Sequence, residues 1–161
     1  MIERARAAFR DDAAAIPAMT LRGGAAIDGY EAPPARDPEA DEPSDAYLET
    51  YAYWGLAYLD PASWRHYLPG LIDYALRHLG EPGSMVTEGL LESLRPPDRE
   101  PPRLGSLSGE QEAVVVAVLD LLAFDERSAC RELAMQVLEE YWIPNALYRH
   151  DSRLSSKPPI G

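Results

Sequence analysis

The fold is decided by the stretch SGEQEAVVVAVLDLLAF, which occupies residues 108–124. Ser108 is followed three positions later by Gln111, and this pair predicts a capping box in which each side chain accepts the main-chain N–H of the other residue. From Ala113 to Phe124 the segment is apolar apart from Asp120. A helix that is apolar almost all round is usually central and buried. We therefore expect a helix over residues 108–124 in the middle of a helical core.

Further helices are predicted on both sides of this segment, because apolar residues recur at helical spacing and capping residues or prolines mark the ends. The expected helices cover residues 2–16, 44–58, 60–79, 84–94 and 125–142. Pro69 falls inside one of them and predicts a bend, since proline lacks an N–H and clashes with the preceding turn. We expect an all-α fold, with residues 1–150 forming a single domain, an irregular bundle of about six or seven helices. A loose C-terminal tail is expected over residues 151–161.

One stretch near the N-terminus does not fit a helix. Residues 20–43 contain the pairs Gly23-Gly24 and Pro33-Pro34, two further prolines and many acidic residues. Glycine and proline at this density favour a loop. A loop of this length inside a compact domain is unusual unless it is mobile or functional. We therefore expect a flexible acidic loop over residues 20–43.

The composition limits what the protein can be. Of its 161 residues, 27 are acidic and 15 are basic, which gives a net charge of −12 at pH 7. Direct binding of nucleic acid is not expected, because it needs clustered basic side chains and Lys157 is the only lysine. Neither a membrane-spanning segment nor a signal peptide is recognised, so we expect a cytoplasmic protein with no membrane partner. The single Cys130 excludes an intrachain disulfide, and many arginines with almost no lysine favour a bacterial source.

Two segments resemble those of a known family. The first is LDPASWRHYLP, residues 59–69, which runs from Pro61 through an aromatic residue to a final Tyr-Leu-Pro at Pro69. The second combines the leucine-rich residues 90–96 with LSGEQ, residues 107–111, before the apolar helix. Together they are similar to an uncharacterised family of small bacterial all-α proteins of unknown function. The resemblance implies a helical fold and supplies no activity and no catalytic residues.

No arrangement of side chains predicts catalysis directly. The histidines are not spaced four apart, so no helical zinc pair is expected, and we predict no metal and no cofactor. The adjacent acids Glu139 and Glu140 are expected to point to solvent. One catalytic alternative stays open, in which His66 acts as a general base with Asp60 or Asp73.

The predicted helix over residues 44–58 carries an aromatic stripe with spacings of four, three and four. Core packing is the commonest role of such a stripe, but tyrosine and tryptophan also dominate binding hot spots. Gly55 beside it would let a second helix approach closely. Because the stripe follows the acidic loop, the loop would steer a basic partner and the stripe would anchor it. The partner-binding candidates are Tyr47, Tyr51, Trp54, Tyr58, Asp37, Glu39, Asp41 and Glu42.

These observations predict a non-catalytic, acidic protein-binding module of a bacterium, in the form of an immunity or antitoxin-like inhibitor of a basic partner protein. Two alternatives remain open. One is a DNA mimic, whose carboxylates copy the spacing of phosphates. The other is an enzyme that uses His66 with Asp60 or Asp73.

Overall fold

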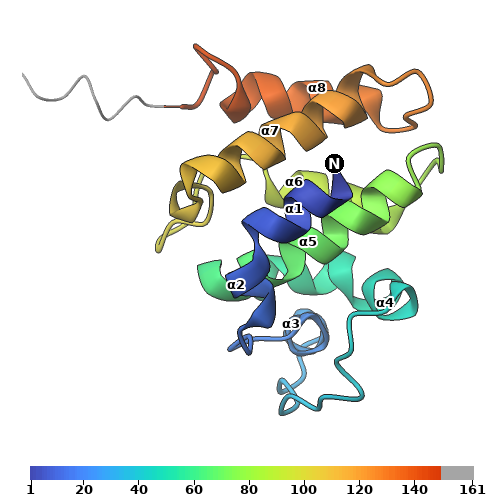
Figure 1. The fold of residues 1–161 in the computed structure, drawn as a ribbon. Helices are drawn as coiled ribbons and strands as arrows, with labels where there is room; N and C mark the ends of the chain where they lie inside the picture. The colour runs from blue at the N-terminus through green and yellow to red at the C-terminus, as the bar shows by residue number, and fades with distance from the viewer. Residues whose placement is uncertain (150–161) are drawn as a thin grey trace, which may run out of the picture.

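The computed structural model describes residues 1–149, and within that range the chain forms helices and turns without a strand (Figure 1). The all-α class is confirmed, with eight α-helices where about six or seven were predicted. The α-helices are α1 (Ile2–Ala8), α2 (Arg10–Ala14), α3 (Leu21–Asp28), α4 (Asp45–Gly55), α5 (Pro61–Arg77), α6 (Met85–Ser93), α7 (Gly109–Phe124) and α8 (Arg131–Val137). The short turns are η1 (Leu56–Tyr58), η2 (Leu104–Ser106) and the π-helical η3 (Leu138–Trp142). The tail predicted over residues 151–161 lies outside the described range.

The starts of α4, α5, α6 and α7 are the predicted ones, because each depends on a local hydrogen bond. Ser44, Asp60 and Ser84 each accept the main-chain N–H of the residue three positions later, at 3.2, 3.2 and 3.3 Å. Ser108 and Gln111 form the complete capping box. Each cap satisfies donors that the first turn of a helix would otherwise leave unpaired.

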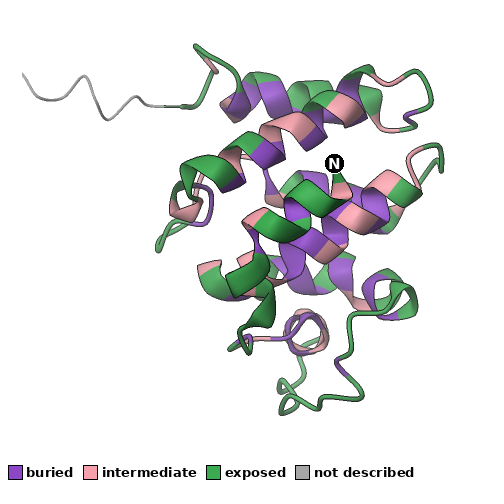
Figure 2. Ribbon diagram, viewed as in Figure 1, coloured by how far each residue is buried: buried purple, intermediate pink, exposed green. Residues whose placement is uncertain are grey.

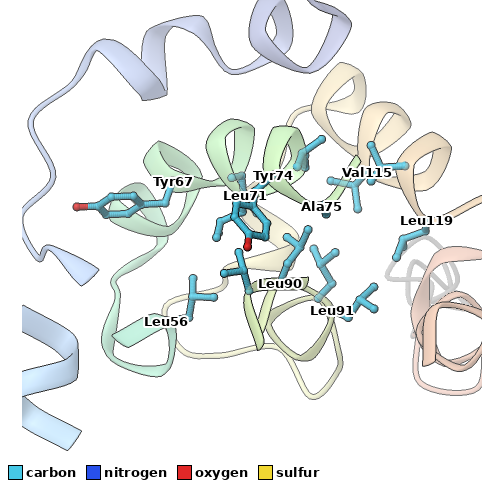
Figure 3. Close-up of a cluster of buried hydrophobic side chains, with 14 of the residues drawn as sticks. Leu56, Tyr67, Leu71, Tyr74, Ala75, Leu90, Leu91, Val115 and Leu119 are labelled. Atoms are coloured by element: carbon cyan, nitrogen blue, oxygen red, sulfur yellow. The ribbon is translucent and has the colours of Figure 1, made fainter. Parts of the chain in front are cut away.

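The core lies between α5, α6 and α7, whose side chains point toward one another in Figure 3. Among the labelled residues are Leu71 and Ala75 of α5, Leu90 and Leu91 of α6, and Val115 and Leu119 of α7. Each fully buried Leu or Val stabilises the fold by about 1.5–3 kcal/mol relative to an exposed one. The helix over 108–124 is buried on one face only, because Ala113, Asp120 and Phe124, which share its opposite face, are exposed (Figure 2). The central position belongs instead to α5, which α1, α2 and α6 contact.

Helix α5 passes without interruption through Pro69, where a bend was predicted. Trp64 and Leu68 beside it are fully buried. Packing of this kind offsets the cost of about 3 kcal/mol that a proline inside a helix carries. Although α5 is 17 residues long, no helix in residues 1–149 is both long and apolar enough to span a membrane.

The stretch expected as a loop over residues 20–43 contains helix α3, so that prediction is wrong for Leu21–Asp28. Thr20 caps α3 by accepting the N–H of Gly23 at 2.9 Å. The glycines of this helix serve a close crossing with α4, because a Cβ atom at Gly24 would lie 2.4 Å from the main-chain oxygen of Gly55. The expectation that Gly55 admits a second helix is therefore confirmed, and α3 is that helix. The glycines lower the helical propensity of α3, and tertiary packing overrides it.

Other helix boundaries also differ from the predicted ones. The first predicted helix, residues 2–16, is broken at Phe9 into α1 and α2, and Phe9 is fully buried. The last begins at Arg131 with Cys130 before it, not at residue 125. Glu140, expected in solvent, is buried and pairs with Arg95 at 2.9 Å. Arg95 lies 45 residues before Glu140 in the sequence. No local sequence pattern therefore predicts this ion pair.

Candidate functional site

The aromatic stripe of α4 runs from the core to the surface. Tyr47 is only 5% exposed and Tyr51 is half-buried, whereas Trp54 is 49% and Tyr58 is 39% exposed. Seven residues separate Tyr47 from Trp54, so the two lie on nearly the same face of the helix. Their different burial is therefore decided by what covers the helix at each end.

A hydrogen-bonded network covers the Tyr47 end. The carboxylate of Asp41 accepts the Tyr47 hydroxyl at 2.9 Å, the Arg22 guanidinium at 2.8 and 3.0 Å, and the N–H of Asp37 at 2.8 Å. Burial alone would raise the pKa of Asp41, but the hydrogen bonds from Arg22, Asp37 and Tyr47 outweigh it and lower that pKa to about 2. The candidate roles of Tyr47 and Asp41 in partner binding are therefore corrected, because both side chains are buried in this network.

The other acidic candidates lie at the surface. Asp37, Glu39 and Glu42 are exposed, as is the rest of the connection from Gly29 to Ser44 apart from Asp41 (Figure 2). Asp37 also orders its own turn, since its Oδ1 accepts the N–H groups of Glu39 and Ala40 at 2.9 Å. The connection thus presents carboxylates to solvent while Asp41 ties it to α3 and α4.

The three residues of the catalytic alternative have separate partners. His66 Nδ1 lies 3.1 Å from the main-chain oxygen of Asp12. Asp60 caps α5 through Ser63, and the carboxylate of Asp73 lies 3.3 Å from Arg77. These contacts do not bring His66 together with either carboxylate. Residues 1–149 also contain no cluster of acidic, histidine or cysteine side chains suited to a metal ion.

A groove lies beside the exposed end of the stripe, and we call it the aromatic groove. It consists of two hollows of about 320 and 410 Å³ that share four lining residues, Glu92, Ser93, Arg99 and Arg103. Tyr53 and Trp54 line the smaller hollow, and their rings meet edge to face with centroids 4.9 Å apart. Gly89 of α6 allows the two helices to approach, because a Cβ there would lie 3.3 Å from the Cα of Tyr53.

The connection between α6 and α7 forms the opposite wall, and Asp98 shapes it. The carboxylate of Asp98 accepts the N–H groups of Arg99, Arg103, Leu104 and Gly105 at 2.8–2.9 Å. Burial would raise the pKa of Asp98, but these four donors lower it. The ionised carboxylate therefore holds this proline-rich connection in one conformation, with both arginines directed toward α4 and η1.

The two arginines donate hydrogen bonds to the unpaired main-chain carbonyl groups at the end of the α4–η1 segment. Arg103 Nε donates to the carbonyl of Leu59 at 3.1 Å, its Nη2 donates to Leu59 at 2.7 Å and to Leu56, and Arg99 donates to Ala57. Terminal carbonyls of a helix have no partner within the helix, and cations there are favourable. Burial lowers the pKa of Arg103 to about 10, with the charge of Arg99 as a second cause. Arg103 is therefore both a structural cap and a buried cation in the groove wall.

Sequence reasoning identified Trp54 in the groove and Tyr58 beside it, whose hydroxyl donates to the lining residue Asp28. It missed Tyr53, Arg99 and Arg103. The one available signal was the spacing of Arg95, Arg99 and Arg103 at intervals of four in a proline-rich connection. Nothing in that spacing shows that a segment more than 40 residues away supplies the opposite wall.

A larger hollow, of about 460 Å³, lies elsewhere, between the α5–α6 and α7–α8 connections. His78 and Cys130 both line it. His78 Nδ1 lies 2.8 Å from Glu81, and the sulfur of Cys130 lies 3.5 Å from the Ser128 hydroxyl. No hydrogen bond joins the cysteine to the histidine in the described residues, so the hollow shows no nucleophile paired with a base.

Comparison with known proteins gives one match. A family model described as "Family of unknown function (DUF6714)" matches residues 1–146. No curated protein and no solved structure matches the chain. The expectation of an uncharacterised family is confirmed by this match.

Proposed function

The chain belongs to the DUF6714 family of unknown function, and from that premise we propose that it is a non-catalytic protein-binding module. The observation that carries the proposal is a group of exposed aromatic residues, Tyr53, Trp54 and Tyr58, at the edge of the aromatic groove. Such rings combine a large apolar area with polar edges and lose little conformational entropy on binding. They are the residue types that anchor protein–protein interfaces.

The charge distribution supports a basic partner. Many arginines are neutralised within the molecule by carboxylates, among them Arg22, Arg65, Arg77, Arg95 and Arg127. The surplus of acidic residues, which makes the net charge −12, is displayed on surfaces such as residues 29–44. A surface of this sign accelerates encounter with a positively charged partner.

The acidic connection begins next to the aromatic residues. The Tyr58 hydroxyl donates to Asp28 at 2.9 Å, and Asp28 is the last residue of α3. Tyr30, two residues further on, is fully exposed. Acidic and aromatic side chains thus adjoin, so that one surface can both steer and anchor a partner. We extend the proposal to an immunity or antitoxin-like inhibitor in a bacterial cytoplasm, on the strength of size, charge and the single cysteine.

An affinity capture experiment tests the proposal. The tagged protein is incubated with a lysate of the source cells at low and at high salt, and bound proteins are identified by mass spectrometry. We expect a stoichiometric basic partner that the wild type retains better at low salt and that Trp54→Ala and Tyr58→Ala lose. The matched control is Phe124→Ala, which removes a ring that is 60% exposed on α7, outside the groove. Equal recovery by Trp54→Ala and wild type, or no partner at either salt, would contradict the proposal.

The steering role is tested separately by a triple variant, Asp37→Asn, Glu39→Gln and Glu42→Gln. These side chains are exposed, and Asp41 is left intact because its carboxylate holds the fold. We expect a slower association rate and a weaker dependence on salt, with little change in dissociation rate. An unchanged association rate would remove the acidic connection from the mechanism while leaving the aromatic anchor in place.

A further inference from the structure

The aromatic groove contains a buried guanidinium that forms no ion pair within residues 1–149, although the charges of Asp60 and Asp98 act on it. Arg103 is only 3% exposed, yet it lines both hollows. Within residues 1–149 all hydrogen bonds of its guanidinium go to the carbonyls of Leu56 and Leu59, and the Asp98 carboxylate bonds only to its main-chain N–H. Its lowered pKa of about 10 still leaves it cationic at neutral pH. A buried cation that lacks an anion costs free energy, and a bound anion would recover part of that cost.

One donor group of Arg103 remains available. Its Nε and Nη2 are engaged by the carbonyls, and Nη1 has no hydrogen-bond partner among the described residues. Arg99 adds a second, exposed guanidinium to the same lining. Charge-assisted hydrogen bonds from a guanidinium to an oxyanion are about twice as strong as neutral ones. The floor of the groove therefore has the chemistry of an oxyanion site.

The wall of the groove suits a flat ring. Tyr53 and Trp54 line the hollow of about 320 Å³ that Arg103 also lines. Their rings are 37% and 49% exposed, so each has a face or edge free for stacking. A hollow of this size lies at the small end of the range of sites for small molecules, roughly 300–1,000 Å³.

We propose that the aromatic groove binds a small aromatic carboxylate, with the carboxylate on Arg103 and the ring against Trp54. A single negative charge matches the one buried guanidinium of the groove, Arg103, because the second arginine of the lining, Arg99, is exposed to solvent. Anions of higher charge are disfavoured by the field of a chain with net charge −12. The site goes beyond the proposed function and does not depend on it, since its ligand requires no protein partner.

The test uses the tryptophan fluorescence of the purified chain. Trp54 is exposed and lines the groove, whereas Trp64 is buried with the Arg103 guanidinium 6.0 Å from its ring centroid, so a ligand in the groove perturbs Trp54 directly and Trp64 through Arg103. The probes are benzoate, its neutral analogue benzamide, and phenyl phosphate. We expect a saturable change with benzoate, an affinity at least about tenfold lower for benzamide, and weaker binding of phenyl phosphate. Benzoate, but not benzamide, is expected to raise the unfolding temperature.

Variants place the ligand in the groove. Arg103→Gln is expected to lose benzoate binding about tenfold or more, while the control Arg36→Gln, at an exposed arginine outside the groove, binds as wild type. Trp54→Phe is expected to lose the direct part of the fluorescence response and to keep the part that Trp64 reports through Arg103, while calorimetry still detects benzoate. If Arg103→Gln does not fold, the wild-type comparison of benzoate with benzamide decides.

Three results would overturn the assignment. The first is no saturable response to benzoate up to about 10 mM, a concentration that detects even millimolar affinities. The second is equal binding of benzoate and benzamide, or tighter binding of phenyl phosphate. The third is unchanged benzoate affinity in a folded Arg103→Gln variant. None of these results affects the capture experiment, because that experiment depends on a partner protein and this one uses the chain alone.

Discussion

The substitution Gly55→Ala tests the closest contact in the fold. Gly55 ends α4, where α3 crosses it, and both Gly55 and Gly24 are buried. A Cβ atom at Gly55 would lie 2.2 Å from the main-chain oxygen of Leu21 and 2.9 Å from its carbonyl carbon. Both of these are backbone atoms, so no side-chain rotation relieves the overlap. Helix α3 must move away from α4 by about 1 Å to restore ordinary contact.

The expected cost follows from this displacement. Forcing extra volume into a packed core costs about 1–3 kcal/mol, and the upper end applies here because backbone has to move. Replacing glycine by alanine in a helix increases the free energy of unfolding by about 1 kcal/mol, because alanine has the higher helix propensity. The net destabilisation is therefore about 2 kcal/mol. Leu21, which is fully buried at the crossing, carries much of the loss.

Urea unfolding followed by circular dichroism measures the effect, and Gly70→Ala is the matched control. Gly70 lies inside α5, and a Cβ there meets nothing within 4 Å. The urea midpoints of the two variants should shift in opposite directions. Gly55→Ala should lower the urea midpoint by about 1 M, and Gly70→Ala should raise it by about 0.3–0.5 M. A Gly55→Ala protein as stable as wild type would refute the close crossing of α3 and α4.

Further substitutions concern two acidic residues that accept several hydrogen bonds each, Asp41 at the Tyr47 end of α4 and Asp98 in the wall of the aromatic groove. Because the pKa of Asp41 is lowered to about 2 from its ordinary value of 3.8, the unfolded chain binds more protons than the folded chain mainly between these two values, and stability is lost as the pH falls through that interval. That loss is about 2 kcal/mol, since each pKa unit corresponds to about 1.36 kcal/mol. Urea midpoints between pH 5 and pH 2 should fall more steeply for wild type than for Asp41→Asn; parallel curves would show that another carboxylate is responsible. Asp98→Ala leaves four N–H donors without their acceptor and should cost about 2 kcal/mol, whereas Asp98→Asn keeps one acceptor oxygen and should cost less. Equal midpoints for these two Asp98 variants would count against the carboxylate as the organiser of the connection.

The aromatic groove is a site that the sequence alone predicts only in part. Trp54 and Tyr58 were recognised because aromatic residues at helical spacing form a visible pattern in the sequence. Arg103 was not, because its role depends on the carbonyls of Leu56 and Leu59, more than 40 residues away. Asp98 directs it there through four hydrogen bonds within one short connection. The groove therefore exists only when the α6–α7 connection meets the end of α4.

Local signals determined where four helices of this protein, α4, α5, α6 and α7, begin. Ser44, Asp60, Ser84 and Ser108 mark helix starts, since a cap bonds to a main-chain group three residues away and needs no other part of the chain. Periodic apolar residues then predict which class of fold can bury them. The acidic net charge is likewise a property of the sequence alone.

Tertiary structure decided which face of each helix is covered. Tyr47 and Trp54 have nearly equivalent places on α4, and one is buried because Asp41 and Arg22 close over it while the other remains at the surface. Helix α3 forms where its glycines predict a loop, because their missing side chains let its backbone lie against Gly55. Burial depends on contacts between residues far apart in the chain, and such contacts leave no periodic trace in the sequence. The four capped helices follow from neighbours along the chain, whereas α3 and the aromatic groove follow from neighbours in space.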